Sequence, residues 1–370
     1  MNLAIILIAV FGLFALVQLY YYLAIFTKIS KAPTNLLTNR EGVSVIICSR
    51  NNRQGLEDNL PLILSQNHPN FEVIVVNDGS TDGTIDFLDL LAQENEKLKV
   101  LHLDIDERFH RGKKFAQTIG IKAAKHEQLI FTDSDCQPAS TMWLQIMCNH
   151  FSESHHIVLG VGQYEQKRNL LNWLTQLDTF HTHLLFLNFS IAKKTYMGVG
   201  RNLAYKRSLF FSVKGFASHQ HLLSGDDDLF VNETATAQNV SVCIEPEAKT
   251  ISKPHEKWSH WIYQKRRHYS TGKLYKPAHK FMLGLYSISL FMFYVTFVLS
   301  LVLFPTYWLP ILGIFILRFI VQAIVLLKNM QILGYKPYFF GYPLFDFGIL
   351  FIQIFIGIRG YFSKPLRWNS

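Results

Sequence analysis

Residues 43–48 read VSVIIC and residues 71–76 read FEVIVV, and both are short runs of β-branched and apolar residues. The segment between them, Leu56–Gln66, has the length of a helix. The alternation continues with apolar runs at Val100–Leu103 and Leu129–Thr132 and with helical stretches at Thr84–Glu94 and Lys113–Lys125. Strands that alternate with helices predict an α/β domain built on a mostly parallel sheet with right-handed crossovers.

Polar residues follow three of these predicted strands directly. Ser49 and Arg50 follow the first strand, Asp78 follows the second, and Asp133 and Asp135 follow the fourth. In parallel α/β sheets, ligands bind at the carboxyl ends of the strands. Two carboxylates at positions i and i+2 can both reach one Mg²⁺ or Mn²⁺ ion, whereas an aspartate-rich turn can also hydrogen-bond to its own backbone. The spacing therefore allows two interpretations, a metal site and a capped turn.

A further acidic run, residues 225–228 (GDDD), precedes a predicted helix that continues to Gln238. Acidic residues are favoured at a helix N-terminus, so capping explains part of this run. Three adjacent carboxylates exceed what capping needs, and like charges raise one another's pKa. Because a raised pKa suits a general base, Asp226 and Asp227 are candidate catalytic residues.

The chain is more apolar than a soluble protein of its size. Of its 370 residues 49% are hydrophobic and 17% are charged, whereas soluble domains carry about 25% charged residues. Leu3–Phe26, Phe281–Phe304 and Trp308–Leu327 are uncharged or nearly uncharged stretches long enough to cross a membrane, and Pro343–Phe362 is a weaker fourth candidate. Lysines follow the first stretch, so the positive-inside rule predicts a cytosolic α/β domain in an integral membrane protein.

These features divide the chain into five predicted segments. They are a membrane helix at 1–27, a linker at 28–40, the α/β domain at 41–252, an amphipathic helix at 253–280, and a membrane domain of two or three helices at 281–370. The net charge is +9, yet residues 28–248 contain 21 basic and 25 acidic residues. The basic excess thus lies near the membrane, whereas a nucleic-acid-binding domain would carry it on its folded part. We expect a membrane partner and no nucleic acid.

Aromatic and basic residues interleave at Trp258–Tyr269, WSHWIYQKRRHY. This pattern is typical of an interfacial helix whose lysines and arginines extend to the membrane surface. Gln264 and Arg267, one helical turn apart, are candidates to face a diphosphate from the same helix. Arg318 lies near the middle of an apolar stretch, where an arginine costs about 2.5–3.5 kcal/mol. We expect either a partner such as Asp346 or a shallower position for this arginine.

Seven short motifs resemble family 2 glycosyltransferases of the GT-A fold, in their membrane-bound branch. In chain order they are Val43–Asn52 (VSVIICSRNN), Val76–Thr84 (VNDGSTDGT), Gly112–Gly120 (GKKFAQTIG), Phe131–Pro138 (FTDSDCQP), Gly198–Lys206 (GVGRNLAYK), Gly225–Leu229 (GDDDL) and Gln264–His268 (QKRRH). Each motif is short, but together they cover residues 41–270 in the family's order. The resemblance implies an α/β domain of the GT-A type, flanked by transmembrane helices.

The resemblance also implies how the donor is bound. Asp78 resembles the acid that contacts the nucleotide base, and Ser49 and Arg50 match the same nucleotide pocket. Asp133 and Asp135 match the D-x-D pair, which holds Mg²⁺ or Mn²⁺ across the diphosphate of a nucleotide sugar. Asp133 therefore belongs to both the nucleotide site and the metal site that the resemblance implies.

The remaining implied roles concern chemistry and the acceptor. Asp227 best matches the general base, with Asp226 as the alternative. Gln264, Arg267 and His268 resemble the Q-x-x-R-W element, whose arginine stabilises the leaving diphosphate. The implied reaction is the inverting transfer of a hexosyl or N-acetylhexosaminyl group from a nucleotide sugar, with UDP favoured, to a lipid-linked, polyprenyl-linked or glycan acceptor. The implied setting is the bacterial inner membrane.

The chain departs from the family pattern at four positions. Cys48 stands where proline is common, Asn52 where glutamate is common and Thr118 where asparagine is usual. His268 replaces a tryptophan that is often found in processive polysaccharide synthases. A processive synthase is therefore the alternative enzyme, and a non-catalytic, nucleotide-sensing membrane protein is the alternative from another functional class.

Overall fold

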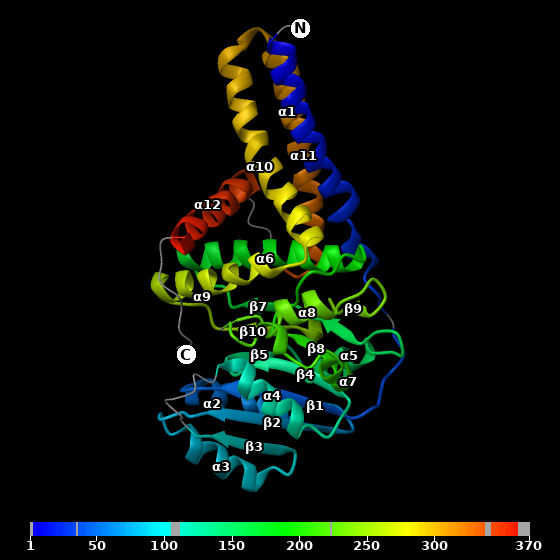
Figure 1. The fold of residues 1–370 in the computed structure, drawn as a ribbon, viewed down its shortest axis with the longest axis vertical. Coiled ribbons are helices and arrows are strands. Elements are labelled where there is room, and N and C mark those ends of the chain that lie inside the picture. Colours follow the sequence, from blue (N-terminus) through cyan, green and yellow to red (C-terminus); the bar gives the residue numbers. More distant parts are fainter. Residues whose placement is uncertain (1–2, 35, 105–111, 223, 337–341, 362–370) are drawn as a thin grey trace.

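The α/β part of the chain and a bundle of long helices form opposite ends of the molecule (Figure 1). The computed structural model describes residues 3–34, 36–104, 112–222, 224–336 and 342–361. The bundle consists of α1 (Leu3–Tyr20), α10 (Pro277–Leu303) and α11 (Trp308–Ile332), which stand side by side. Within the described residues, three segments are long and apolar enough to cross a membrane, namely Leu3–Lys31, Pro277–Leu303 and Pro305–Ile332.

The main sheet has seven strands in the order β3-β2-β1-β4-β8-β6-β9. The first four are β1 (Val43–Ser49), β2 (Phe71–Asp78), β3 (Leu98–Leu103) and β4 (Gln128–Asp133), and they are mutually parallel. Next to β4 lies the antiparallel strand β8 (Leu203–Lys206), followed by β6 (Ile157–Leu159) and β9 (Val240–Val242). The mostly parallel α/β sheet predicted from the sequence is thus confirmed.

The strands β1, β2 and β4 are buried on both faces, which explains their nearly continuous apolar sequences. Val45 and Ile47 pack with residues of α2 (Arg53–Leu64) and α3 (Thr84–Glu94) in one core cluster. Ile46 belongs to a second cluster on the other face, together with residues of α4 (Lys113–Ala123). The predicted helices and these observed helices therefore agree in place and role.

A second, small sheet lies between the main sheet and the bundle. It pairs β5 (Cys136–Pro138), β10 (Thr250–Ser252) and β7 (Gly162–Tyr164) in the order β5-β10-β7. Above it runs α6 (Leu170–Ile191), a 22-residue helix that lies across the base of the bundle (Figure 1). The short helices α5 (Trp143–Asn149), α7 (Arg207–Ser212) and α8 (Asp228–Thr234) complete the domain.

The segment predicted as one interfacial helix at 253–280 consists of two parts. Helix α9 (Trp258–Thr271) ends in the turn Gly272–Leu274, and α10 then begins at Pro277. Lys265 of α9 is buried and forms an ion pair with Asp178 of α6. Lys265 therefore points into the protein and not toward a membrane surface.

The fourth apolar stretch forms α12 (Tyr342–Tyr361), while Phe362 lies outside the described residues. This helix packs against α9 and α6 and lies beside the lower end of the bundle (Figure 1). Its Asp346 lies 2.6 Å from the Nη1 atom of Arg318, and both side chains are almost completely buried. The expected pairing of Arg318 with Asp346 is thus confirmed, and the Arg318 side chain does not extend to the protein surface.

Candidate active site

Three of the predicted polar strand ends meet at one edge of the main sheet. In the register of the sheet, Ser49 of β1 lies opposite Asn77 of β2. On the other side of β1, Cys48 lies opposite Asp133 of β4. Because the strands are parallel, the residues that follow them project at the same edge, which is where this fold class binds ligands.

The Ser49 side of this edge offers groups suited to a nucleotide. Ser49 is 1% exposed, and its hydroxyl has no hydrogen-bond partner among the described residues. A buried hydroxyl without a partner is costly unless a ligand or water satisfies it. Next to it, the Nη1 atom of Arg50 lies 3.8 Å from Oδ2 of the buried Asp78. The predicted nucleotide residues are therefore neighbours in the structure.

Lys113, the first residue of α4, bridges two of the predicted acidic residues. Its Nζ atom lies 2.7 Å from Oδ1 of Asp133 and 3.1 Å from Oδ2 of Asp226. Burial alone would lower the pKa of Lys113, but the charges of Asp133, Asp226 and Asp227 raise it well above its ordinary value. The sequence analysis gave this lysine no role, although its position directly after Gly112 in the GKK motif was a signal.

Asp226 and Asp227 differ in their electrostatics. Burial raises the pKa of Asp226, but the charges of Lys113 and Arg267 outweigh burial and lower it below its ordinary value. For Asp227, burial and the charges of Asp226 and Asp228 raise the pKa to about 7. A carboxyl group with a pKa near neutral pH is suited to proton transfer. Of the two, Asp227 is therefore the carboxyl group whose pKa lies near neutral pH.

Backbone N–H groups hold the Asp227 carboxylate in place. Its Oδ2 atom accepts a hydrogen bond from Gly200 N–H at 2.8 Å, and its Oδ1 atom accepts one from Asp228 N–H at 2.7 Å. A Cβ atom at Gly200 would lie 3.3 Å from that oxygen, so glycine permits the close approach. Gly200 belongs to the GVGRN motif, and its role as a donor was also missed by the sequence analysis.

Asp228 has a structural part in the site. Its Oδ2 atom accepts hydrogen bonds from the hydroxyl of Thr271 and, at 2.8 Å, from that of Tyr275. Burial raises the pKa of Asp228 although it accepts these bonds. Since Thr271 ends α9 and Tyr275 precedes α10, Asp228 connects the acidic run to the segment that enters the bundle.

Asp133 and Asp135 fit a divalent cation. Their carboxylates and the sulfur of Cys136 offer ligand atoms within 4.8 Å of one another. Asp135 is exposed to solvent, yet the surrounding protein and the charge of Asp133 raise the pKa of its carboxyl above the ordinary value. Burial and both carboxylates also keep the Cys136 thiol protonated by raising its pKa. The two oxygen donors therefore suit Mg²⁺ or Mn²⁺, and the thiol does not.

The three residues of the predicted Q-x-x-R-W-like element have separate surroundings. Arg267 joins the site, because its charge acts on Asp226 and its buried Nε atom has no hydrogen-bond partner among the described residues. Gln264 donates instead to the hydroxyl of Tyr164 at 3.2 Å. The side chain of His268 is exposed, and no hydrogen bond among the described residues connects it to the carboxylates. Of the three, Arg267 is thus the one whose charge lowers the pKa of a carboxylate in the acidic cluster.

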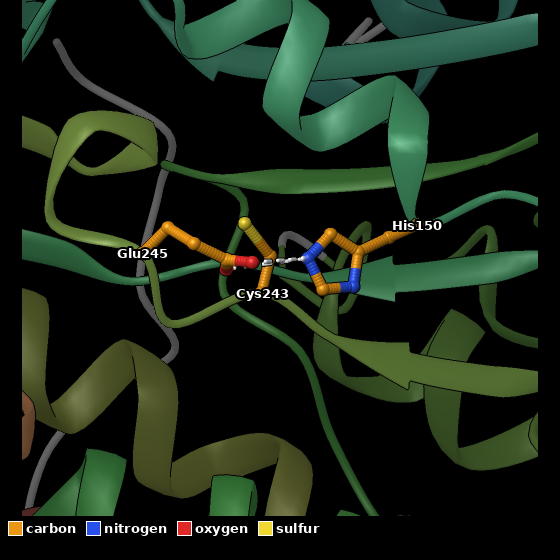
Figure 2. A group of neighbouring side chains, drawn as sticks. All are labelled: His150, Cys243 and Glu245. Carbon is orange, nitrogen blue, oxygen red and sulfur yellow. Dashed lines mark hydrogen bonds and ion pairs between the residues drawn. The ribbon is translucent and has the colours of Figure 1, made fainter. Parts of the chain in front are cut away.

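A second group of potential metal ligands lies elsewhere and consists of His150, Cys243 and Glu245 (Figure 2). The Nε2 atom of His150 lies 3.2 Å from both carboxylate oxygens of Glu245, and its Nδ1 atom lies 2.8 Å from Oγ of Ser241. Burial and the charge of Glu245 raise the pKa of the Cys243 thiol well above its ordinary value. His150 and Glu245 therefore form a hydrogen-bonded pair that attaches the segment after β9 to the end of α5, and the neutral Cys243 thiol lies beside this pair.

Residues 44–212 match the family model described as glycosyl transferase family 2. A 93-residue stretch is 37% identical to the putative teichuronic acid biosynthesis glycosyltransferase TuaG of Bacillus subtilis, covering 25% of this chain and 35% of that protein. A 95-residue stretch is 33% identical to the poly-β-1,6-N-acetyl-D-glucosamine synthase of Staphylococcus epidermidis, covering 26% of this chain and 22% of that protein. The chain thus matches about a third or less of the length of these curated relatives.

Solved structures include a similar fold over almost the whole chain. The mannosyltransferase PcManGT from Pyrobaculum calidifontis, solved in complex with GDP-Man and Mn²⁺, aligns with a TM-score of 0.63. The alignment covers 98% of this chain and 100% of that chain at 20% sequence identity, so the likeness concerns the fold. Residues 44–212 of this chain are thus similar to glycosyl transferase family 2, and the chain as a whole shares its fold with PcManGT.

Proposed function

We propose that this protein transfers a sugar, with inversion, from a nucleotide diphosphate sugar to an acceptor hydroxyl on a lipid or polyprenyl carrier at the cytosolic membrane surface. One observation carries the proposal. Asp227, whose pKa is raised to about 7, lies in the same cluster as the Lys113-bridged carboxylates of Asp133 and Asp226. This arrangement combines a base for the acceptor with charged groups for a diphosphate.

In the proposed reaction, Asp227 takes the proton of the acceptor hydroxyl. The hydroxyl oxygen forms a bond to the anomeric carbon of the donor sugar, while the bond from that carbon to the diphosphate oxygen breaks. Attack occurs on the face opposite the diphosphate, so the configuration at the anomeric carbon is inverted. The N–H groups of Gly200 and Asp228 orient the carboxylate for this proton transfer.

Cationic side chains stabilise the negative charge of the departing nucleoside diphosphate. Arg267 offers its unpartnered Nε donor from α9, and Lys113 offers an ammonium group from the start of α4. Such preorganised donors stabilise charge as it develops in the transition state. A divalent cation bound to Asp133 and Asp135 would add neutralisation of the diphosphate oxygens.

The donor is proposed to be a UDP-sugar that carries a hexosyl or N-acetylhexosaminyl group. Ser49, Arg50 and Asp78 are the residues proposed to contact its nucleoside. Because the structurally similar PcManGT was solved with GDP-Man, a GDP-sugar is the first competing donor to compare. A membrane-associated acceptor is supported by α9, which carries Arg267 and continues through Gly272–Leu274 into α10.

Thermal shift of the detergent-purified protein against nucleoside diphosphates, with and without Mn²⁺, tests the donor site. A ligand at 100 times its Kd stabilises the folded state by about 2.7 kcal/mol. We expect a Mn²⁺-dependent shift with one nucleotide, lost in Asp133→Ala and kept in Asp86→Ala, an exposed acid of α3. If no nucleotide shifts the protein, the donor site is wrong and the non-catalytic alternative becomes the better one.

A processive polysaccharide synthase is the second candidate, because a stretch of the chain is 33% identical to poly-β-1,6-N-acetyl-D-glucosamine synthase. Once a donor is known, product length separates the two candidates. Single additions on a gel support the transferase, whereas a ladder of increasing length supports the synthase.

A further inference from the structure

A cavity of about 710 Å³ lies where the first membrane segment meets the α/β domain. Its walls include Tyr20 and Ala24 from that segment, Lys28 and Lys31 from the end of the segment, and Lys193 and Lys194 from the residues just after α6. None of the residues assigned to the candidate active site lines this cavity. It is therefore a separate feature of the molecule.

The charge of the cavity is strongly one-sided. Its lining contains four lysines and no aspartate or glutamate. Within the described part of the chain, no ion pair joins any of these lysines to an acid. Such a concentration of unneutralised positive charge at one hollow attracts anions.

A hydrogen bond connects the two segments that carry these lysines. Ile29, between Lys28 and Lys31, donates its N–H to Oδ1 of Asn188 in α6 at 2.8 Å. Lysines near the end of a helix also favour its dipole, which would explain Lys193 and Lys194 but not the pair from the other segment. Four cations from two segments distant in sequence thus converge on one space.

Lys193 has a backbone conformation that favours glycine. Its φ angle is +63°, in the left-handed region that glycine usually occupies at the end of a helix. Glycine would therefore be unstrained at this position.

The polarity of the cavity lining also changes along the axis of the first membrane segment. Tyr20 and Ala24 lie within the segment that is apolar enough to cross a membrane, whereas Lys28 and Lys31 lie at its end. The apolar and aromatic side chains thus lie deeper along the membrane segment than the lysines. A lipid has the same order, since its acyl chains lie deeper in the membrane than its phosphate. We propose that this cavity binds the phosphate headgroup of an anionic phospholipid from the leaflet next to the α/β domain.

Lipid binding to the full-length protein in a neutral detergent tests the proposal. Phosphatidylglycerol, phosphatidylcholine and inorganic phosphate are added separately, and bound lipid is counted by native mass spectrometry with thermal shift as the second readout. We expect phosphatidylglycerol to bind preferentially, and Lys193→Gln/Lys194→Gln to weaken it about 25-fold, since each charge near a membrane contributes about fivefold. The matched control Lys273→Gln/Lys280→Gln, at the membrane edge beside α10, should bind phosphatidylglycerol like the wild type.

Two further measurements separate a lipid from a soluble anion as the ligand, and separate loss of binding from loss of stability. Lys193→Gly relieves the backbone conformation and removes the charge, so it should melt at a higher temperature without lipid and still bind phosphatidylglycerol less tightly. If inorganic phosphate stabilises the protein as well as phosphatidylglycerol does, a soluble anion is the ligand and the lipid proposal is overturned. Equal binding of both lipids, or equal loss in the control variant, overturns it as well.

Discussion

Asp226 and Asp227 are adjacent in sequence but have opposite pKa shifts. The Lys113 ammonium lies 3.1 Å from Asp226, whereas the carboxylate of Asp227 is held by backbone N–H groups and faces the charges of its two neighbours. The charges of Lys113 and Arg267 lower the pKa of Asp226, whereas burial and two neighbouring carboxylates raise that of Asp227. A sequence motif with three aspartates does not contain this information.

Replacing Asp227 by asparagine should lower kcat for sugar transfer by about 10²- to 10⁴-fold, the usual contribution of a general base. Donor binding should persist, because asparagine keeps the size of the side chain. The wild-type rate should rise as the pH increases through about 7, since the base must be ionised, and the residual rate of Asp227→Asn should lack this step. Initial rates from pH 5.5 to 8.5 measure both effects, with Asp86→Asn as control. A wild-type rate in Asp227→Asn would remove it as the base.

Lys113→Met should change the response to metal. Without its ammonium, the carboxylates of Asp133 and Asp226 lose their shared cation, so the metal-free protein should lose about 1–3 kcal/mol of stability. The increase in Tm caused by Mn²⁺ should become larger than in the wild type, because the ion no longer competes with Lys113. Lys122→Met, on the exposed side of the same helix, is the control. A smaller Mn²⁺ effect would mean that Lys113 assists binding of the ion.

Polar side chains inside the apolar core join the elements on either side of α6. Asn329 of α11 donates to the carbonyl oxygen of Phe26 at 2.8 Å and accepts from Asn188 of α6 at 2.9 Å. Both asparagines are completely buried. These bonds fix the bundle to the α/β domain at a defined rotation.

Asn329→Leu should therefore destabilise the protein by about 2–4 kcal/mol, because each buried group left without a partner costs about 1–3 kcal/mol. The expected result is a lower Tm in the same detergent. Lys328→Leu, at the exposed neighbouring position, should leave the Tm nearly unchanged. Equal melting of the two variants would show that the hydrogen bonds add no net stability.

The elements that the sequence predicted well are those with strong local patterns. β1 to β4 extend at most two residues beyond their predicted ends, and α3 has the predicted bounds. The predicted helix to Gln238 ends instead at Thr234, because Asn239 bonds to the carbonyl oxygen of Thr234 and to the N–H of Thr236 and so competes with helix continuation.

The strands of the small sheet and helix α6 lack a hydrophobic periodicity from which they could be predicted. The strands of the small sheet have three residues each, which is too short for any period to appear. Helix α6 is buried on nearly all sides and carries polar residues such as Gln176 and His183 inside, so it lacks an amphipathic stripe. In the site, Asp133 and Asp227 were predictable from motifs, whereas Lys113 and Gly200 acquire their roles only through long-range packing.

Four membrane-side helices share one buried polar network. Arg318 of α11 donates to Asp346 of α12 and, at 2.9 Å, to Gln18 of α1, while Tyr294 of α10 donates to Asp346 at 2.8 Å. Buried charges of this kind are costly when unpaired but satisfied when paired and hydrogen-bonded. The network therefore specifies how α12 meets the bundle.

Arg318→Leu should destabilise the whole protein by about 3–5 kcal/mol, because it leaves Asp346 buried without its cation. The double variant Arg318→Leu/Asp346→Leu should recover part of this loss, since neither charge is then buried alone. Tm values of the two single variants and the double variant in one detergent measure this coupling. Losses that simply add would show that the two residues act independently.

The core that runs through α6 has a consequence for protein production. Phe180 and Phe189 of this helix make edge-to-face contacts with Phe345 of α12 and with Tyr21 of the first membrane segment, respectively. A fragment of residues 41–252 would contain α6 but lack both of these partners, so aromatic side chains of α6 would be exposed to water. We expect such a fragment to aggregate, so the domain should be expressed together with the helices that precede and follow it. The helices before and after the α/β domain are therefore a structural part of the fold.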